Sequence, residues 1–195
     1  TMRGGKVSWG QITDEGLAAA EALIGQPLRR TRMQWIEAAS RDAIRHFAWG
    51  IGDNNPLWLD PEYAAASPAG GLVGPPCMLY GVDSTIVAPK LPGVQWIYAG
   101  TDWTWYDRIR VDDHFTVDAR LTSQTEKSGR RFPRWVLQSG EVTYANQRGE
   151  RIARAVGHCA RTPRGDQLAA ETGSAGESAK PYHYTCLLYT SDAAD

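Results

Sequence analysis

Apolar residues recur at helical spacing along the first half of the chain. A first helix is predicted to begin after Thr13, a good capping residue, and to end at Gly25. A second helix is predicted to begin after Ser40, because four apolar residues share one face at positions i, i+3, i+4 and i+7: Ile44, Phe47, Ala48 and Ile51. Residues 29–37 alternate and predict a first strand, and a short helix is predicted to follow Asp60.

A strongly apolar helical pattern lies near the middle of the chain. Pro75 and Pro76 can open a helix that runs through Ile86, and this helix is predicted to be buried because it is apolar on most faces. Residues 68–74 before it are rich in glycine, which allows close contact with a neighbour or a ligand. Residues 87–93, with two prolines, predict an ordinary loop.

From Val94 onward the apolar residues alternate with polar ones, which is the period of a half-buried strand. Four strands separated by turns are predicted over residues 96–106, 115–122, 135–146 and 151–161. Helices first and a long antiparallel meander afterwards predict an α+β architecture.

Composition narrows the functional classes. A chain of 195 residues, 42% of them hydrophobic, can bury a core and forms one or at most two domains. A formal net charge of −1 offers no electrostatic footprint for nucleic acid or a membrane surface, and no apolar run of about 18 residues predicts a membrane span. The three cysteines show neither metal-site spacing nor a disulfide framework, and no secretory leader is recognisable, so we expect a cytoplasmic location.

The composition changes near the end of the chain. Residues 164–185 are rich in small and acidic residues without periodicity, which predicts a linker, and we expect it to lead to a second half that is missing here. Residues 186–195 resemble a translated sequencing-library adapter, with a disordered natural terminus as the alternative. The predicted folded domain is therefore residues 10–163.

The loop that follows the second predicted helix carries the most informative motif. It runs from Gly52 to Trp58, and Pro56 forces Asn55 into an extended conformation. Together with the helix before it and the Gly-Pro-Pro helix after it, this loop resembles the active-site region of the MaoC-like, hydratase-2 type dehydratases, whose motif is Asp-x-Asn-Pro-x-His. Asp53, Asn55 and Pro56 match that motif, whereas Trp58 stands at the position of the family's catalytic histidine.

This resemblance implies a hot-dog fold, in which an antiparallel sheet wraps a central helix. It also implies an (R)-specific 2-enoyl-CoA hydratase or 3-hydroxyacyl-thioester dehydratase, a hydro-lyase of fatty acid or steroid side-chain metabolism. By the family's pattern, Asp53 is the catalytic carboxylate, Asn55 positions it, and the backbone N–H of Cys77 stabilises the thioester oxyanion. The implied substrate-binding residues are Gly74, Pro76, Met78 and Tyr80. The thioester of coenzyme A is the substrate, and neither a metal nor a separate cofactor is expected.

Trp58 changes what the resemblance implies about activity. An indole N–H donates a hydrogen bond but cannot accept a proton, so Trp58 cannot act as a general base. No histidine lies in a motif that would replace it: His46, His114, His158 and His183. We therefore expect this domain to be inactive alone and to be the substrate-accommodating half of a double hot-dog or heteromeric enzyme. Its expected partners are an acyl thioester and a second hot-dog domain or subunit, in a homodimer or heterodimer, with no nucleic acid or membrane.

Other interpretations remain open at this level. Asp53 and Asn55 can be simple turn formers, because both residue types favour turns before proline. The domain can be a non-catalytic acyl-CoA binding or scaffolding subunit. A hot-dog thioesterase also uses an acidic residue and water, but the loop ahead of the central helix is not its usual arrangement.

Two further groups of residues have alternative interpretations. The basic cluster formed by Lys127, Arg130, Arg131 and Arg134 is predicted to be a solvated turn, with a contact to the phosphates of coenzyme A as the alternative. Cys77 and Cys159 are predicted to be small core residues. They are not predicted to be nucleophiles, because the sequence places no histidine partner beside either.

Overall fold

The computed structural model describes residues 10–28 and 34–164, which belong to one compact unit. The predicted linker over residues 164–185, apart from Arg164, and the predicted adapter over residues 186–195 lie outside the described residues. Most of the predicted first strand, residues 29–33, lies outside them as well.

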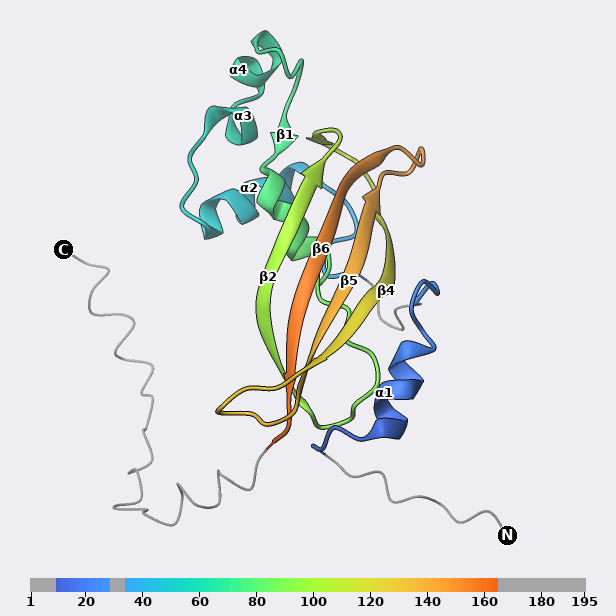
Figure 1. Ribbon diagram of the computed structural model, residues 1–195. Helices are drawn as coiled ribbons and strands as arrows, with labels where there is room; N and C mark the ends of the chain where they lie inside the picture. The colour runs from blue at the N-terminus through green and yellow to red at the C-terminus, as the bar shows by residue number, and fades with distance from the viewer. Residues whose placement is uncertain (1–9, 29–33, 165–195) are drawn as a thin grey trace, which may run out of the picture. The chain divides into compact units, whose positions relative to one another are not determined.

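A four-stranded antiparallel sheet forms the body of the unit (Figure 1). Its order is β2-β6-β5-β4, so β2 and β4 are the two edge strands. The bounds are β2 Gln95–Trp105, β4 Thr116–Lys127, β5 Trp135–Ala145 and β6 Arg151–Thr162. All four strands were predicted from the alternating pattern, and their boundaries agree to within a few residues. A two-stranded sheet pairs β1 (Val73–Gly74) with β3 (Ile109–Arg110).

The N-terminal helices begin where their capping residues predict. Thr13 Oγ1 accepts from the Gly16 N–H at the start of α1 (Asp14–Glu21), and Ser40 Oγ accepts from the Ala43 N–H at the start of α2 (Arg41–Gly50). Two short helices follow, α3 (Pro56–Leu59) and α4 (Pro61–Ala66). The apolar face of α2 is shorter than predicted, because Ile51 lies beyond the helix end and is exposed. No helix of the described chain is long and apolar enough to cross a membrane.

The predicted first strand is wrong over the residues of it that the structure describes, 34–37. Residues 34–37 belong to no strand, although Ala38 forms an isolated bridge with His114. The Phe115 N–H donates to the Glu37 carbonyl at 2.8 Å, and the Ala39 N–H donates to the Asp113 carbonyl at the same distance. This extended segment therefore contacts the start of β4 over too few residues to build a ladder.

The central helix is shorter than predicted, because it ends at Val82 and not at Ile86. A 3-10 turn, η1 (Pro76–Met78), leads into α5 (Leu79–Val82), and both pack on one face of the sheet (Figure 1). The helix ends at Asp83 because side chains there compete for backbone donors: Asp83 Oδ1 accepts from the Ser84 N–H, and Ser84 Oγ accepts from the Ile86 N–H. Three residues of the helix are fully buried, as predicted: Met78, Leu79 and Val82.

The two cysteines differ in their surroundings. Cys159 is buried in the sheet, as predicted, and burial raises the pKa of its thiol. Cys77 is exposed on η1, so the prediction of a core cysteine was wrong there. A 3-10 turn at a helix start presents one face to solvent, and Cys77 lies on that face beside the buried Met78.

Residues 85–94, here called the crossing segment, lie directly on the sheet and are not the ordinary loop that the two prolines predicted. They cross at Gly140 of β5 and Gly157 of β6, which are cross-strand partners. A Cβ atom on Gly157 would overlap with the Thr85 carbonyl oxygen, and one on Gly140 would overlap with the Val87 side chain. Both positions therefore require glycine for close approach of the backbone.

Candidate functional site

The Asp53 loop is held by its own side chains. Asp53 Oδ1 accepts from the Asn55 N–H at 3.0 Å, and Asn55 Oδ1 accepts from the Leu57 N–H at 3.0 Å. Asn55 is extended and caps α3, with Pro56 at the first helical position, as the sequence predicts. Both side chains therefore act as turn and cap formers here, whatever further role they have.

Trp58 takes up the second oxygen of the same carboxylate. Its indole Nε1 donates to Asp53 Oδ2 at 2.9 Å, and its ring packs against the main core. Asp53 thus has Oδ1 engaged by the backbone of its own loop and Oδ2 engaged by the side chain that replaces the family's histidine. Both hydrogen bonds fix the position of the Asp53 carboxylate. Neither partner can take up a proton, because a backbone N–H and an indole N–H are donors only.

A cavity of about 820 Å³ lies beside Trp58, between the α3–α4 segment and the ends of β2 and β3. Its lining residues come from four separate parts of the chain: Leu57, Trp58, Ser67–Ala69, Val73, Gly74, Pro76 and 105–110. Trp58 lines this cavity, whereas Asp53 and Asn55 do not. Asp53 is therefore linked to the cavity lining through its hydrogen bond with Trp58 and does not contact the cavity itself.

Some of the other site residues implied by the resemblance line the cavity, and others do not. Gly74 and Pro76 line the cavity, as expected for substrate contacts. Met78 is fully buried in the core and does not line it. The N–H of Cys77 has no acceptor among the described residues, as an oxyanion donor requires, and that role stays a prediction.

Tyr80 lies at the β2 side of the molecule and not in the cavity lining. Its hydroxyl accepts from Trp103 Nε1 at 2.8 Å and lies 3.4 Å from the hydroxyl of Tyr98. Burial acts to raise the pKa of Tyr80, but these hydrogen bonds outweigh it and the pKa is lowered. This polar group belongs to the edge of the sheet, so its predicted contact with substrate also stays a prediction.

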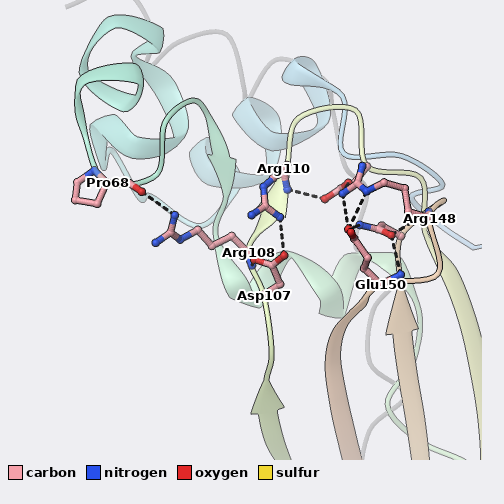
Figure 2. A network of polar contacts seen from close by, with 8 residues as sticks. Pro68, Asp107, Arg108, Arg110, Arg148 and Glu150 are labelled. Atoms are coloured by element: carbon pink, nitrogen blue, oxygen red, sulfur yellow. Dashed lines mark hydrogen bonds and ion pairs between the residues drawn. The ribbon is translucent and has the colours of Figure 1, made fainter.

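An arginine network borders the cavity (Figure 2). Arg110 Nη1 contacts Asp107 Oδ2 at 2.7 Å, and this hydrogen bond is the main reason that the pKa of Asp107 is lowered. Arg148 in turn pairs with Glu150 at 2.7 Å. Arg108 points away from these pairs and donates from Nη1 to the carbonyl oxygen of Pro68 at 2.9 Å. Sequence reasoning missed these rim residues, although the charged run 107–110 at the end of a predicted strand could have indicated them.

No described histidine reaches the place that Trp58 occupies. His46, His114 and His158 are all absent from the cavity lining, and His183 lies outside the described residues. His158 lies on the sheet beside Ser139, with its Nδ1 2.9 Å from Ser139 Oγ and its Nε2 3.2 Å from Asp102 Oδ2. The described chain also contains no group of three or more His, Cys, Asp or Glu residues able to hold a metal ion.

The basic cluster lies at the other end of the sheet (Figure 1). It occupies the turn between β4 and β5, where Arg134 pairs with Glu126 and Asp14, and the strands run roughly 35 Å from there to the end that carries the cavity. This position agrees with a solvated turn.

The fold is that of a hot-dog domain, and the family comparison places it in the dehydratase class. The family model of the FAS1-like dehydratase domain region matches residues 22–155, and the chain belongs to this family. The resemblance to MaoC-like dehydratases is thereby confirmed. A curated relative, described as a UPF0336 protein of Streptomyces avermitilis, is 26% identical over an alignment of 97 residues that covers 46% of this chain. The match spans 64% of the length of that relative.

Solved structures share the fold at low sequence identity. The ChsH1-ChsH2 complex from Mycobacterium tuberculosis has a TM-score of 0.61 at 16% identity, covering 77% of this chain and 96% of that one. A MaoC-like dehydratase from Rhodospirillum rubrum has a TM-score of 0.52 at 24% identity, covering 66% and 87%. The R-hydratase PhaJ1 from Pseudomonas aeruginosa has a TM-score of 0.53 at 21% identity, covering 73% and 83%. The predicted α+β hot-dog fold is confirmed.

Proposed function

We propose that this chain is the substrate-accommodating, catalytically incomplete half of an (R)-specific 2-enoyl-CoA hydratase or 3-hydroxyacyl-thioester dehydratase. The observation that carries this proposal is the hydrogen bond from Trp58 Nε1 to Asp53 Oδ2. The family motif supplies the reaction class, and the cavity beside Trp58 supplies the space for an acyl group.

The chemistry explains why the indole matters. Adding water across a 2-enoyl thioester requires one group to take a proton from water and another to give a proton to the α-carbon. Asp53 alone would have to perform both steps, while Trp58 can only donate a hydrogen bond. Asp53 does not line the cavity, whereas Trp58 does, so a thioester bound there would contact Trp58 and not the carboxylate.

Replacing Trp58 by histidine tests this account. We expect wild type to hydrate crotonyl-CoA no faster than the uncatalysed background. Trp58→His should raise the rate about a hundredfold above that background, the low end of what a positioned acid–base group contributes. The measurement is the loss of enoyl-thioester absorbance. Adding Asp53→Asn to Trp58→His should remove the gain.

The matched control is Trp49→His, which makes the same change at an exposed tryptophan of α2. Wild-type turnover that Asp53→Asn abolishes would contradict the proposal. A Trp58→His variant that stays folded and binds a thioester without gaining activity would instead favour the second candidate, a non-catalytic acyl-thioester binding or scaffolding subunit.

We further propose that a second hot-dog domain pairs along β2. This edge strand has β6 as its only partner among the described strands. Five large side chains in β2 or directly after it are exposed: Trp96, Ile97, Tyr98, Trp105 and Tyr106. An open strand of eleven residues with exposed aromatic side chains is a pairing surface. The similar ChsH1-ChsH2 structure is itself a complex of two named components.

Light scattering can test the pairing. We expect the chain to be dimeric, and Ile97→Lys to shift it to monomer, because a lysine on a strand edge opposes edge-to-edge pairing. Trp35→Lys is the control, since Trp35 is 60% exposed and lies outside β2. A dimer that survives Ile97→Lys would place the interface elsewhere, and a monomeric wild type would exclude self-pairing and leave a heteromeric partner.

A further inference from the structure

One guanidinium at the cavity, that of Arg108, forms no ion pair within the described residues. Arg108 lines the cavity, and its position is held at two points. Its backbone N–H donates to Asp107 Oδ1 at 2.7 Å, and its Nη1 donates to the carbonyl oxygen of Pro68 at 2.9 Å. The second bond joins residues 40 positions apart in the sequence, so Arg108 connects the two walls of the cavity (Figure 2).

The carboxylates nearby belong to other arginines. Asp107 Oδ2 pairs with Arg110, and Glu150 pairs with Arg148. Asp113 accepts from the Arg110 backbone N–H at 2.8 Å and lies 3.7 Å from Arg148. Within the described ranges, Arg108 has no carboxylate within ion-pair distance. Arg108 therefore forms no ion pair among the described residues, although its charge lowers the pKa of Asp107 from a longer distance.

The surroundings of this charge fit an amphiphilic ligand. Trp58, Trp105, Pro76 and Ile109 provide apolar walls, and a cavity of about 820 Å³ is within the range that holds a ligand of moderate size. With Nη1 already bonded to Pro68, the other donors of the guanidinium remain for a ligand. A planar guanidinium matches the oxygen atoms of a carboxylate or a phosphate better than any other side chain.

We propose that Arg108 is a specificity-determining residue that binds an oxyanion of the ligand in this cavity. The inference rests on the proposed function, because it takes that ligand to be an acyl thioester. The oxyanion is either a phosphate of the thioester carrier or a carboxylate at the far end of the acyl chain. Both sources present the same chemistry to Arg108, and a set of matched probes separates them.

Calorimetric titration with three probes tests the assignment. Hexanoyl-CoA carries phosphates, the adipoyl thioester of N-acetylcysteamine carries only a carboxylate, and the hexanoyl thioester of N-acetylcysteamine carries neither. We expect Arg108→Gln to weaken binding of one anionic probe about tenfold, the low end for a hydrogen bond to a charged group, and to leave the uncharged probe unchanged. The probe that responds identifies the source of the oxyanion.

Arg131→Gln is the matched control, because it removes the same charge from the turn at the other end of the sheet. An equal loss of affinity for all three probes would overturn the proposal, since Arg108 would then act only by holding the cavity wall at Pro68. No loss for either anionic probe would overturn it as well.

Failure of the proposed function would look different. If wild type binds none of the thioesters, the acyl-thioester assignment is wrong, and titration with inorganic pyrophosphate still tests Arg108. Saturable binding of pyrophosphate that Arg108→Gln abolishes and Arg131→Gln retains would support an oxyanion site. Pyrophosphate binding that is absent, or equal in both variants, would overturn it.

Discussion

Replacing Gly157 by alanine is expected to lower the free energy of unfolding by about 3 kcal/mol, the upper end for overpacking a core. An added Cβ would overlap with the carbonyl oxygen of Thr85, a backbone atom that cannot turn aside as a side chain can. Thr85 is held in addition by its hydroxyl, which lies 2.9 Å from that of Thr101 on β2. Relief therefore requires the crossing segment to lift off the sheet, and its core contacts would be lost.

Thermal and urea unfolding measure this effect. A loss of this size should lower Tm by roughly 6–12 °C for a domain of this length. Gly71→Ala is the control, because a Cβ there meets no atom within 4 Å and the backbone has no positive φ, so its stability should stay within about 0.5 kcal/mol of wild type. Equal stabilities of the two variants would show that residues 85–87 do not lie on the sheet.

Replacing Arg161 by methionine is expected to cost about 3 kcal/mol, the upper end of the penalty for leaving a buried polar group unsatisfied. Arg161 is 3% exposed on β6 and donates to four carbonyl oxygens of the crossing segment, those of Ala88, Lys90, Leu91 and Val94. It also donates to Gln138 Oε1 at 3.0 Å. Methionine would leave these buried acceptors without a donor.

The same interactions shape the backbone of the crossing segment. Lys90 and Leu91 both have positive φ, at 60° and 54°, a backbone conformation that residues other than glycine rarely adopt. The guanidinium holds both carbonyls at once, so it stabilises a conformation that would otherwise be unfavourable. Burial lowers the pKa of Arg161 relative to a free guanidinium, because no carboxylate among the described contacts offsets the loss of water.

A second arginine of the same strand provides the comparison. Arg154 pairs with Glu141 at 2.6 Å, and both side chains are about a third exposed. Arg154→Met should therefore cost less than about 1 kcal/mol, as for other exposed pairs. Urea unfolding of both variants decides the matter: if Arg161→Met costs no more than Arg154→Met, the crossing segment does not depend on the guanidinium.

The elements with local causes could be predicted from the sequence. The four long strands follow from alternation, and α1, α2 and α4 begin beside the capping residues Thr13, Ser40 and Asp60. The motif loop is equally local, since Asp53, Asn55 and Trp58 interact within six consecutive positions.

Predictions failed where contacts join distant segments. The apolar pattern favoured a helix to Ile86, but the chain leaves the helix at Asp83 and runs across the sheet at Gly157. That path depends on two glycines being opposite each other on β5 and β6, which is a matter of strand register. The short turn between β5 and β6 can set that register locally, but only packing of the crossing segment, which is distant in sequence, selects this glycine pair as its contact.

At the candidate site, local sequence and tertiary structure determine different features. The sequence by itself determined the motif, the turn geometry of Asp53 and Asn55, and the absence of the family's histidine, because each is a property of neighbouring residues. Only the tertiary structure decided that Trp58 lines a cavity, and that Arg108 lies at the same cavity with no ion pair among the described residues. The cavity walls come from segments about 50 positions apart, so long-range packing alone brings them together.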